Sequence, residues 1–190
     1  MMKKRWISLF VENDIGVLAR ISGLFSGKSY NLNSLTVGAT EDTTISRMTI
    51  SLTSDDKTFE QIKKQLNRSV EVIKVVDLTD TAIHMKELMF IKIHGCSGDD
   101  MMKLSYIKET FLAKMIDYAP STVLIESVQT ETRNNDLIKL LENTFSGRIE
   151  VVRGGSVAIE AISFFTVISG AASRFFMADK HKFEIKQHGL

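Results

Sequence analysis

The sequence predicts an α+β protein in which two similar units follow each other along the chain. Runs that alternate between apolar and polar residues predict strands, and apolar residues at helical spacing predict helices between them. The same order of elements occurs in both halves of the 190 residues. Apolar side chains make up 44% of the chain and charged side chains 25%, as in ordinary globular proteins.

The first unit begins with a strand, a short loop and a helix. Residues 6–11 alternate in polarity, and residues 17–25 carry the apolar stripe of an amphipathic helix. The loop Asn13-Asp14-Ile15-Gly16 holds two side chains suited to capping that helix. Such a junction gathers unpaired backbone N–H groups and the positive end of the helix dipole, which suits a small anion such as a carboxylate. Gly16 has no side chain to keep a ligand from the backbone.

The remaining elements of the first unit complete a common pattern. Two strands are predicted at 32–40 and 45–53, joined as a hairpin, and a helix begins after Ser54-Asp55-Asp56. A last strand covers 70–78. The order β-α-β-β-α-β is the ferredoxin-like arrangement, with one antiparallel four-stranded sheet and both helices on one face.

The second half repeats this order, although it shares little residue identity with the first. Its helices carry the apolar stripes of residues 101–112 and 137–145; Asn134-Asn135-Asp136 is predicted to cap the latter helix, which ends near Gly147. The predicted strands cover 88–94, 115–118, 122–128, and 148–152 with 157–159, the last being broken at Gly154-Gly155.

The domain limits follow from where the periodicity is lost. We predict a first domain at 1–79, a linker at 80–87, a second ferredoxin-like domain at 88–160 and an extension of unknown role at 161–190. Within the extension, residues 161–173 are uncharged, but this run is shorter than the ~20 residues that span a bilayer. We therefore expect no membrane anchor.

The charge balance and the single cysteine point to an ordinary intracellular protein. With 24 basic and 23 acidic side chains, the chain shows no basic excess that would attract nucleic acid. RNA-recognition domains share this fold, but they stack bases on aromatic residues of the central strands, and residues 32–40 and 45–53 contain none. Cys96 cannot form an intramolecular disulfide, so a reducing, cytoplasmic location is expected.

No residue pattern indicates catalysis or metal binding. His94-Gly95-Cys96 is the closest His/Cys pair, and it offers fewer ligands than the three or four a zinc site needs. Phosphate-binding and nucleophile motifs are missing. Gly16 and Asn13 could serve only a turn and a helix cap. A second asparagine, Asn31, at the start of the next strand favours a binding site instead.

The stretch L-F-V-E-N-D-I-G-V-L-A-R-I-S-G-L-F-S-G-K-S-Y-N-L-N-S-L-T-V closely resembles the regulatory (small) subunits of acetohydroxyacid synthase, also called acetolactate synthase. The resemblance is most specific over residues 6–78 and continues more weakly to about Glu160, whereas 161–190 match nothing in that family. It implies that the first unit is an ACT domain, a βαββαβ amino-acid sensor. It also implies a subunit without catalysis of its own, which activates a catalytic subunit and confers feedback inhibition by branched-chain amino acids, chiefly valine. Thiamine diphosphate, magnesium and FAD would then belong to the catalytic partner, and this chain would hold no cofactor.

The resemblance also implies where the effector binds. ACT domains of this family pair side by side as a homodimer, with the effector at the seam. One protomer would contribute the residues from its first loop and helix, and its neighbour the residues at the start of the second strand. The implied effector-binding residues are Asn13, Asp14, Ile15, Gly16, Val17, Leu18, Asn31 and Leu32.

One position departs from the family pattern. Ser29 stands where the family usually has a glycine that ends the helix in the left-handed conformation, and we expect Gly27 to take over that role. Two other classes of protein stay open on the sequence: a free-standing amino-acid sensor or transcriptional regulator, and an enzyme that uses this fold as its scaffold.

Overall fold

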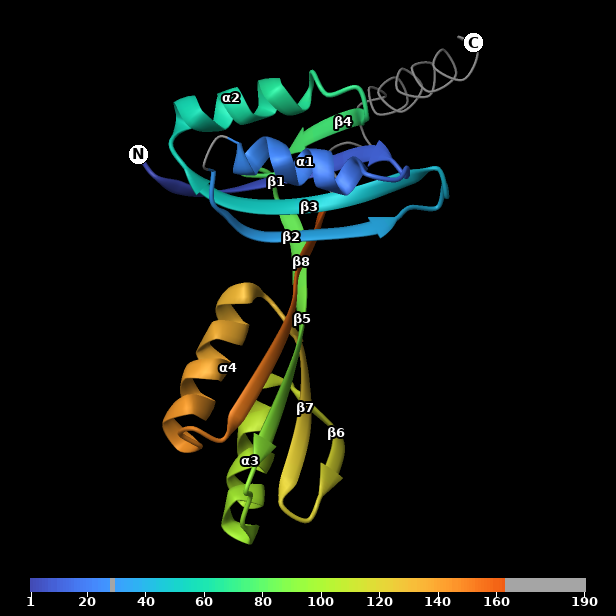
Figure 1. Ribbon diagram of the computed structural model, residues 1–190. Coiled ribbons are helices and arrows are strands. Elements are labelled where there is room, and N and C mark those ends of the chain that lie inside the picture. Colours follow the sequence, from blue (N-terminus) through green and yellow to red (C-terminus); the bar gives the residue numbers. More distant parts are fainter. Residues whose placement is uncertain (28–29, 163–190) are drawn as a thin grey trace. The chain divides into compact units, whose positions relative to one another are not determined.

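The computed structural model describes residues 1–27 and 30–162 (Figure 1). The extension expected at 161–190 therefore lies almost wholly outside the described residues. The first module consists of β1 (Lys3–Glu12), α1 (Val17–Ser26), β2 (Leu32–Ala39), β3 (Ile45–Ser54), α2 (Asp56–Leu66) and β4 (Val72–Asp77). The second module consists of β5 (Ile83–His94), α3 (Gly98–Phe111), β6 (Lys114–Ala119), β7 (Thr122–Gln129), α4 (Glu131–Thr144) and β8 (Ile149–Glu160).

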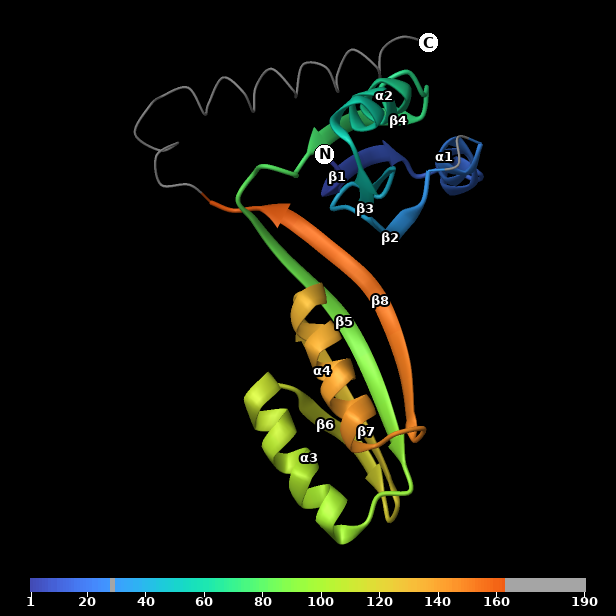
Figure 2. The same cartoon turned by 90° about the vertical axis from the view of Figure 1, so that its left-hand side faces the viewer.

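Each module contains one antiparallel four-stranded sheet. The strand orders are β2-β3-β1-β4 and β6-β7-β5-β8, so the two sheets share the same topology. Figure 2 shows that α1 and α2 lie on one side of the first sheet, and α3 and α4 on one side of the second. The predicted α+β fold of two tandem ferredoxin-like units is confirmed.

The core of each module lies between its sheet and its helices. In the first module, alternate residues of β1 and β3 point toward the helices and are buried against Phe25 of α1 and Phe59 of α2. In the second, β5 and β7 bury alternate residues against Leu104 of α3 and Leu141 of α4. The period-two pattern that predicted these strands is the pattern of burial.

The strands β5 and β8 are longer than predicted, and they contact both modules. Their paired ends, Ile83–Glu87 and Ser156–Glu160, contact the face of the first sheet opposite its helices, where Trp6 packs with Ala158. Ser8 and Ser51 on that face are fully buried. Residues 83–87, predicted to be linker, are strand, because they pair with residues 156–160 of β8. The domain limits stay a prediction.

Two further local predictions were wrong. Helix α4 begins at Glu131, and the hydroxyl of its N-cap Thr130 accepts a hydrogen bond from the amide of Arg133 (3.3 Å). Asn134 therefore lies inside the helix and is fully buried. At Gly154-Gly155 the strand β8 is continuous, because a bulge opposite Glu87–Met89 accommodates the two glycines without ending the pairing.

Helix α3 begins with a capping box that involves a buried carboxylate. Asp100 accepts a hydrogen bond from the Ser97 amide (3.0 Å), the Ser97 hydroxyl accepts one from the Asp100 amide, and Arg148 donates to Asp100 (3.0 Å). The hydrogen bond from the Ser97 backbone, followed by that from Arg148, lowers the pKa of Asp100 to about 2.

This lowered pKa predicts a pH-dependent contribution to stability. Because the folded state favours the carboxylate, the contribution of Asp100 is present above pH ~4 and is lost as the pH falls toward 2. We expect Asp100→Asn to lower the melting temperature at neutral pH, and the difference from the unmodified protein to shrink as the pH falls from 4 to 2. Asp99→Asn, on the exposed neighbour, is the control. A difference that stays constant over this range would contradict the assignment.

Candidate functional site

The loop between β1 and α1 places a glycine in the N-cap position of the helix. Gly16 adopts the left-handed conformation (φ 86°, ψ −7°), and no side chain caps α1. The Val17 amide donates to the Asp14 carbonyl (3.3 Å), and regular helical hydrogen bonding starts with the Arg20 amide, which donates to the Gly16 carbonyl (3.0 Å). The intervening amides of Leu18 and Ala19 are therefore available to a ligand at the positive end of the helix dipole.

The surroundings of this helix end suit an anion. The first turn of α1 contains no acidic residue. A Cβ atom placed on Gly16 would meet nothing within 4 Å, so the space beside its backbone is open. The backbone at this helix end is therefore open, in an arrangement that suits a small anion.

Asn13 has a different role from the helix cap that the sequence predicted. Its side-chain amide donates to the Thr43 carbonyl (2.8 Å), and its side-chain oxygen accepts a hydrogen bond from the Ser46 hydroxyl (2.9 Å). The Asn13 backbone amide donates to the Thr44 carbonyl (2.7 Å). Asn13 therefore ties the loop to the start of β3, whereas Gly16 occupies the cap position because glycine tolerates the positive φ.

The other predicted loop residues divide into an anchor and an exposed group. Val17 is buried in the core of the first module and holds the helix end in place. Asp14 is exposed, Ile15 is fully exposed and Leu18 is 44% exposed. Two apolar side chains thus lie in solvent beside the available amides, where they could contact the apolar part of a ligand or a second protein surface.

Asn31 and Leu32 lie at the start of β2, the edge strand of the first sheet. Asn31 is exposed, and Leu32 is half-buried against the core. Gly27, expected to be left-handed, is right-handed (φ −64°), because its amide continues the helical hydrogen bonding to the Gly23 carbonyl. Ser29 lies outside the described residues.

A buried polar cluster in the second module escaped sequence reasoning. The Glu87 carboxylate is buried and accepts hydrogen bonds from Arg153 (2.9 and 2.7 Å) and from the Asn134 amide (3.0 Å), and the Asn134 oxygen accepts one from Ser127 (2.8 Å). Burial opposes ionisation, but the hydrogen bonds from Arg153 and Asn134 outweigh it and lower the pKa of Glu87. Because its hydrogen bonds are made within the fold, we assign this cluster a structural role.

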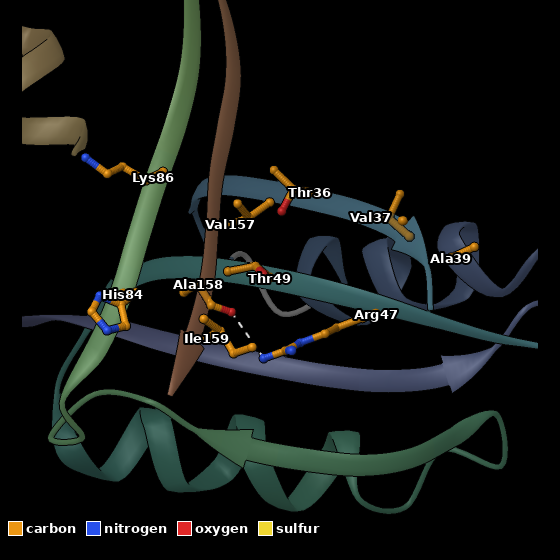
Figure 3. A pocket seen from close by; sticks show the side chains of 11 residues that line it. Thr36, Val37, Ala39, Arg47, Thr49, His84, Lys86, Val157, Ala158 and Ile159 are labelled. Atoms are coloured by element: carbon orange, nitrogen blue, oxygen red, sulfur yellow. Dashed lines mark hydrogen bonds between the residues drawn. The ribbon is translucent and has the colours of Figure 1, made fainter. Parts of the chain in front are cut away.

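A hollow of about 440 Å³ lies beside β2 and the paired ends of β5 and β8 (Figure 3). Val37, Val157 and Ile159 contribute apolar surface, and Arg47 crosses the hollow to donate to the Ala158 carbonyl (3.1 Å). The hollow is open, and its arginine is already hydrogen-bonded to the backbone, so we assign it no catalytic role.

Other kinds of site find little support in the part of the chain that the structure describes. Burial, together with the negative charge of Asp100, raises the pKa of Cys96, which makes this thiol a poor nucleophile. Residues 1–27 and 30–162 hold no group of three or more His, Cys, Asp or Glu side chains that could bind a metal. No helix within these same residues has the length and apolar character needed to cross a membrane.

Comparisons with known proteins define the class of this protein. Residues 7–74 match the family model described as an AHAS small subunit-like ACT domain, and residues 86–162 match the model described as the small subunit of acetolactate synthase. The first module is therefore an ACT domain, followed by the second domain typical of acetolactate synthase small subunits.

Relatives place the chain more narrowly. The acetolactate synthase small subunit of Aquifex aeolicus (strain VF5) is 40% identical over 158 residues, which cover 83% of this chain and 81% of the relative. The acetolactate synthase isozyme 3 small subunit of Escherichia coli (strain K12) is 36% identical over 162 residues, or 81% and 98% of the two chains. The crystal structure of the small subunit from Thermotoga maritima has a TM-score of 0.75 and 30% identity, over 85% of this chain and 99% of that one. This chain belongs to the acetolactate synthase small-subunit family.

Proposed function

We propose that this chain activates the catalytic subunit of acetolactate synthase and makes it sensitive to feedback inhibition by a branched-chain amino acid, chiefly valine. The observation that carries the proposal is the uncapped start of α1 at left-handed Gly16, in an ACT domain of this family. The chain itself would be non-catalytic and cytoplasmic. Thiamine diphosphate, magnesium and FAD would bind to the catalytic partner.

The chemistry of the loop fits the two ends of an amino acid. The valine carboxylate would lie against the backbone at Gly16 and accept hydrogen bonds from the available amides of Leu18 and Ala19. The ammonium group would be held by backbone carbonyls and by the side-chain oxygens of Asn13 and Asn31. Leu18 and Leu32 would border the isopropyl group.

The pocket would be completed by a second copy of the chain. Within the described residues, β2 pairs only with β3, so its outer edge is free to pair with β2 of a partner. Ile15 and Leu18 would then contact the partner instead of solvent. Two-fold symmetry would give two equivalent pockets per homodimer.

Inhibition would follow from a change in how the two ACT domains pair. A ligand shifts a conformational equilibrium only through its different affinities for the two states. If valine favours one pairing and the catalytic subunit favours the other, the coupling amounts to about 1–3 kcal/mol.

The direct test is to titrate this chain into its cognate catalytic subunit with and without valine, and to measure valine binding by calorimetry. We expect activation without valine and inhibition with it. If the chain binds no branched-chain amino acid, or converts pyruvate by itself, the proposal is wrong.

Asn31→Ala is expected to weaken valine binding about tenfold, because it removes one acceptor for the ammonium group. Asn33→Ala provides a matched control on the same strand, since the Asn33 side chain instead accepts a hydrogen bond from Thr53 (3.1 Å). Unchanged affinity in Asn31→Ala would move the pocket away from the start of β2.

A further inference from the structure

We propose that Thr36, Gly155 and Ser156 form a joint that carries the effect of the bound amino acid from β2 to the second module. We call these three residues the β2–β8 joint. The inference rests on the proposed function, because it concerns how valine at the start of β2 would act on the rest of the chain.

A direct hydrogen bond connects the two strands at this joint. The Thr36 hydroxyl donates to the Ser156 carbonyl (3.0 Å), and Ser156 is 1% exposed. Thr36 belongs to the same strand as the proposed effector residue Leu32. The register of β2 with β3 shifts between Leu32 and Ser34, and from Ser34 to Ala39 the pairing is regular. Thr36 lies within this regular stretch, so a displacement of β2 there acts on β8 through the hydrogen bond from Thr36 to Ser156.

Gly155 permits the close approach of the two strands. Its φ is +76°, and a Cβ atom at this position would lie 2.8 Å from the Thr36 methyl carbon. Thr36 cannot rotate that methyl group away without moving the hydroxyl that donates to Ser156. A side chain at position 155 would therefore force β2 and β8 apart.

The joint lies at the one point of β8 where the pairing is irregular. The register of β5 with β8 shifts between Glu87 and Met89, opposite the two glycines. A bulge leaves an extra residue out of the ladder and bends the strand locally, while the pairing continues on both sides. The joint thus combines a tight contact with a locally irregular strand.

Polar contacts connect β8 to β5 and α4 in the second module. Arg153, two residues before Gly155, makes two hydrogen bonds to the buried Glu87 carboxylate. Glu87 in turn accepts from Asn134 in α4. A movement of the bulge is therefore transmitted to β5 and α4 through satisfied polar contacts.

Thr36→Val and Gly155→Ala test the joint in the holoenzyme reconstituted with the cognate catalytic subunit. Valine binding to the small subunit is measured by calorimetry, and valine inhibition by titrating the holoenzyme. We expect valine binding within about threefold of the unmodified protein, while the valine concentration for half-inhibition rises at least about tenfold. Gly147→Ala is the control, because Gly147 has a similar φ (+70°) but no atom near its added Cβ.

The outcomes separate the joint from the proposed function. If both variants are inhibited like the unmodified holoenzyme, the joint is wrong and the proposed function stands. If valine binding weakens as much as inhibition does, Thr36 and Gly155 belong to the binding site and the joint is again wrong. Should Gly155→Ala fail to fold, the isosteric Thr36→Val decides. An unmodified chain that neither binds valine nor inhibits would overturn both proposals.

Discussion

Gly16→Asp is expected to abolish the valine response while leaving activation of the catalytic subunit intact. The substitution places a carboxylate in the open space where the valine carboxylate would lie. Repulsion between the two charges, together with the loss of access to the helix amides, should weaken binding at least about 100-fold, or ~3 kcal/mol. Calorimetry of the small subunit and inhibition curves of the holoenzyme measure the effect.

The control for this prediction separates charge placement from backbone strain. A side chain at a left-handed glycine costs ~1–2 kcal/mol wherever it occurs. Gly147→Asp introduces the same side chain at φ +70°, again in open space, but in the second module. It should retain valine binding. Undiminished binding by Gly16→Asp would refute the location of the carboxylate.

Glu87→Ala is expected to destabilise the folded protein strongly. It removes the carboxylate that accepts from Arg153 and Asn134. The fully buried Asn134 amide keeps only its longer hydrogen bond to the backbone carbonyl of residue 87 (3.3 Å). Leaving buried polar groups without partners should lower the free energy of unfolding by about 2–4 kcal/mol. The melting temperature should fall by roughly 5–15 °C.

An exposed ion pair between β5 and β8 provides the comparison. Glu150 lies 3.5 Å from Lys92, and the side chains are 58% and 44% exposed. Glu150→Ala should change the free energy of unfolding by no more than ~0.5 kcal/mol, because surface pairs are screened by water. Equal losses in the two variants would show that burial does not govern the contribution of Glu87.

The sequence predicted most elements because their faces differ in burial. Residues 6–11 and 45–53 alternate, and the structure buries one set of side chains against the helices. Residues 83–87 were missed because their alternation is short and adjoins a polar turn, whereas the residues with which they pair lie 69 to 77 positions further along the chain. Non-local pairing of this kind is not encoded in a local pattern.

Asn134 and Asn13 show the same limit for polar residues. Asparagine before an apolar stripe is typical of a helix cap. Asn134 is instead buried, where its side-chain amide donates to Glu87 and its side-chain oxygen accepts from Ser127. Asn13 bonds to the start of β3 instead of to its own helix. For the candidate site, the sequence could indicate Gly16 and the helix start, whereas the contacts of Asn13 depend on a distant hairpin.

The paired ends of β5 and β8 have a consequence for how such a chain can diversify. They cover the face of the first sheet on which Trp6 and Ser51 are buried. Residues of both halves of the protein therefore pack together in one hydrophobic cluster. A recombination event that joined a different domain after Leu78 would have to include a pair of strands long enough to cover that face. The two halves are therefore constrained to evolve as one unit, even though each has its own helices and core.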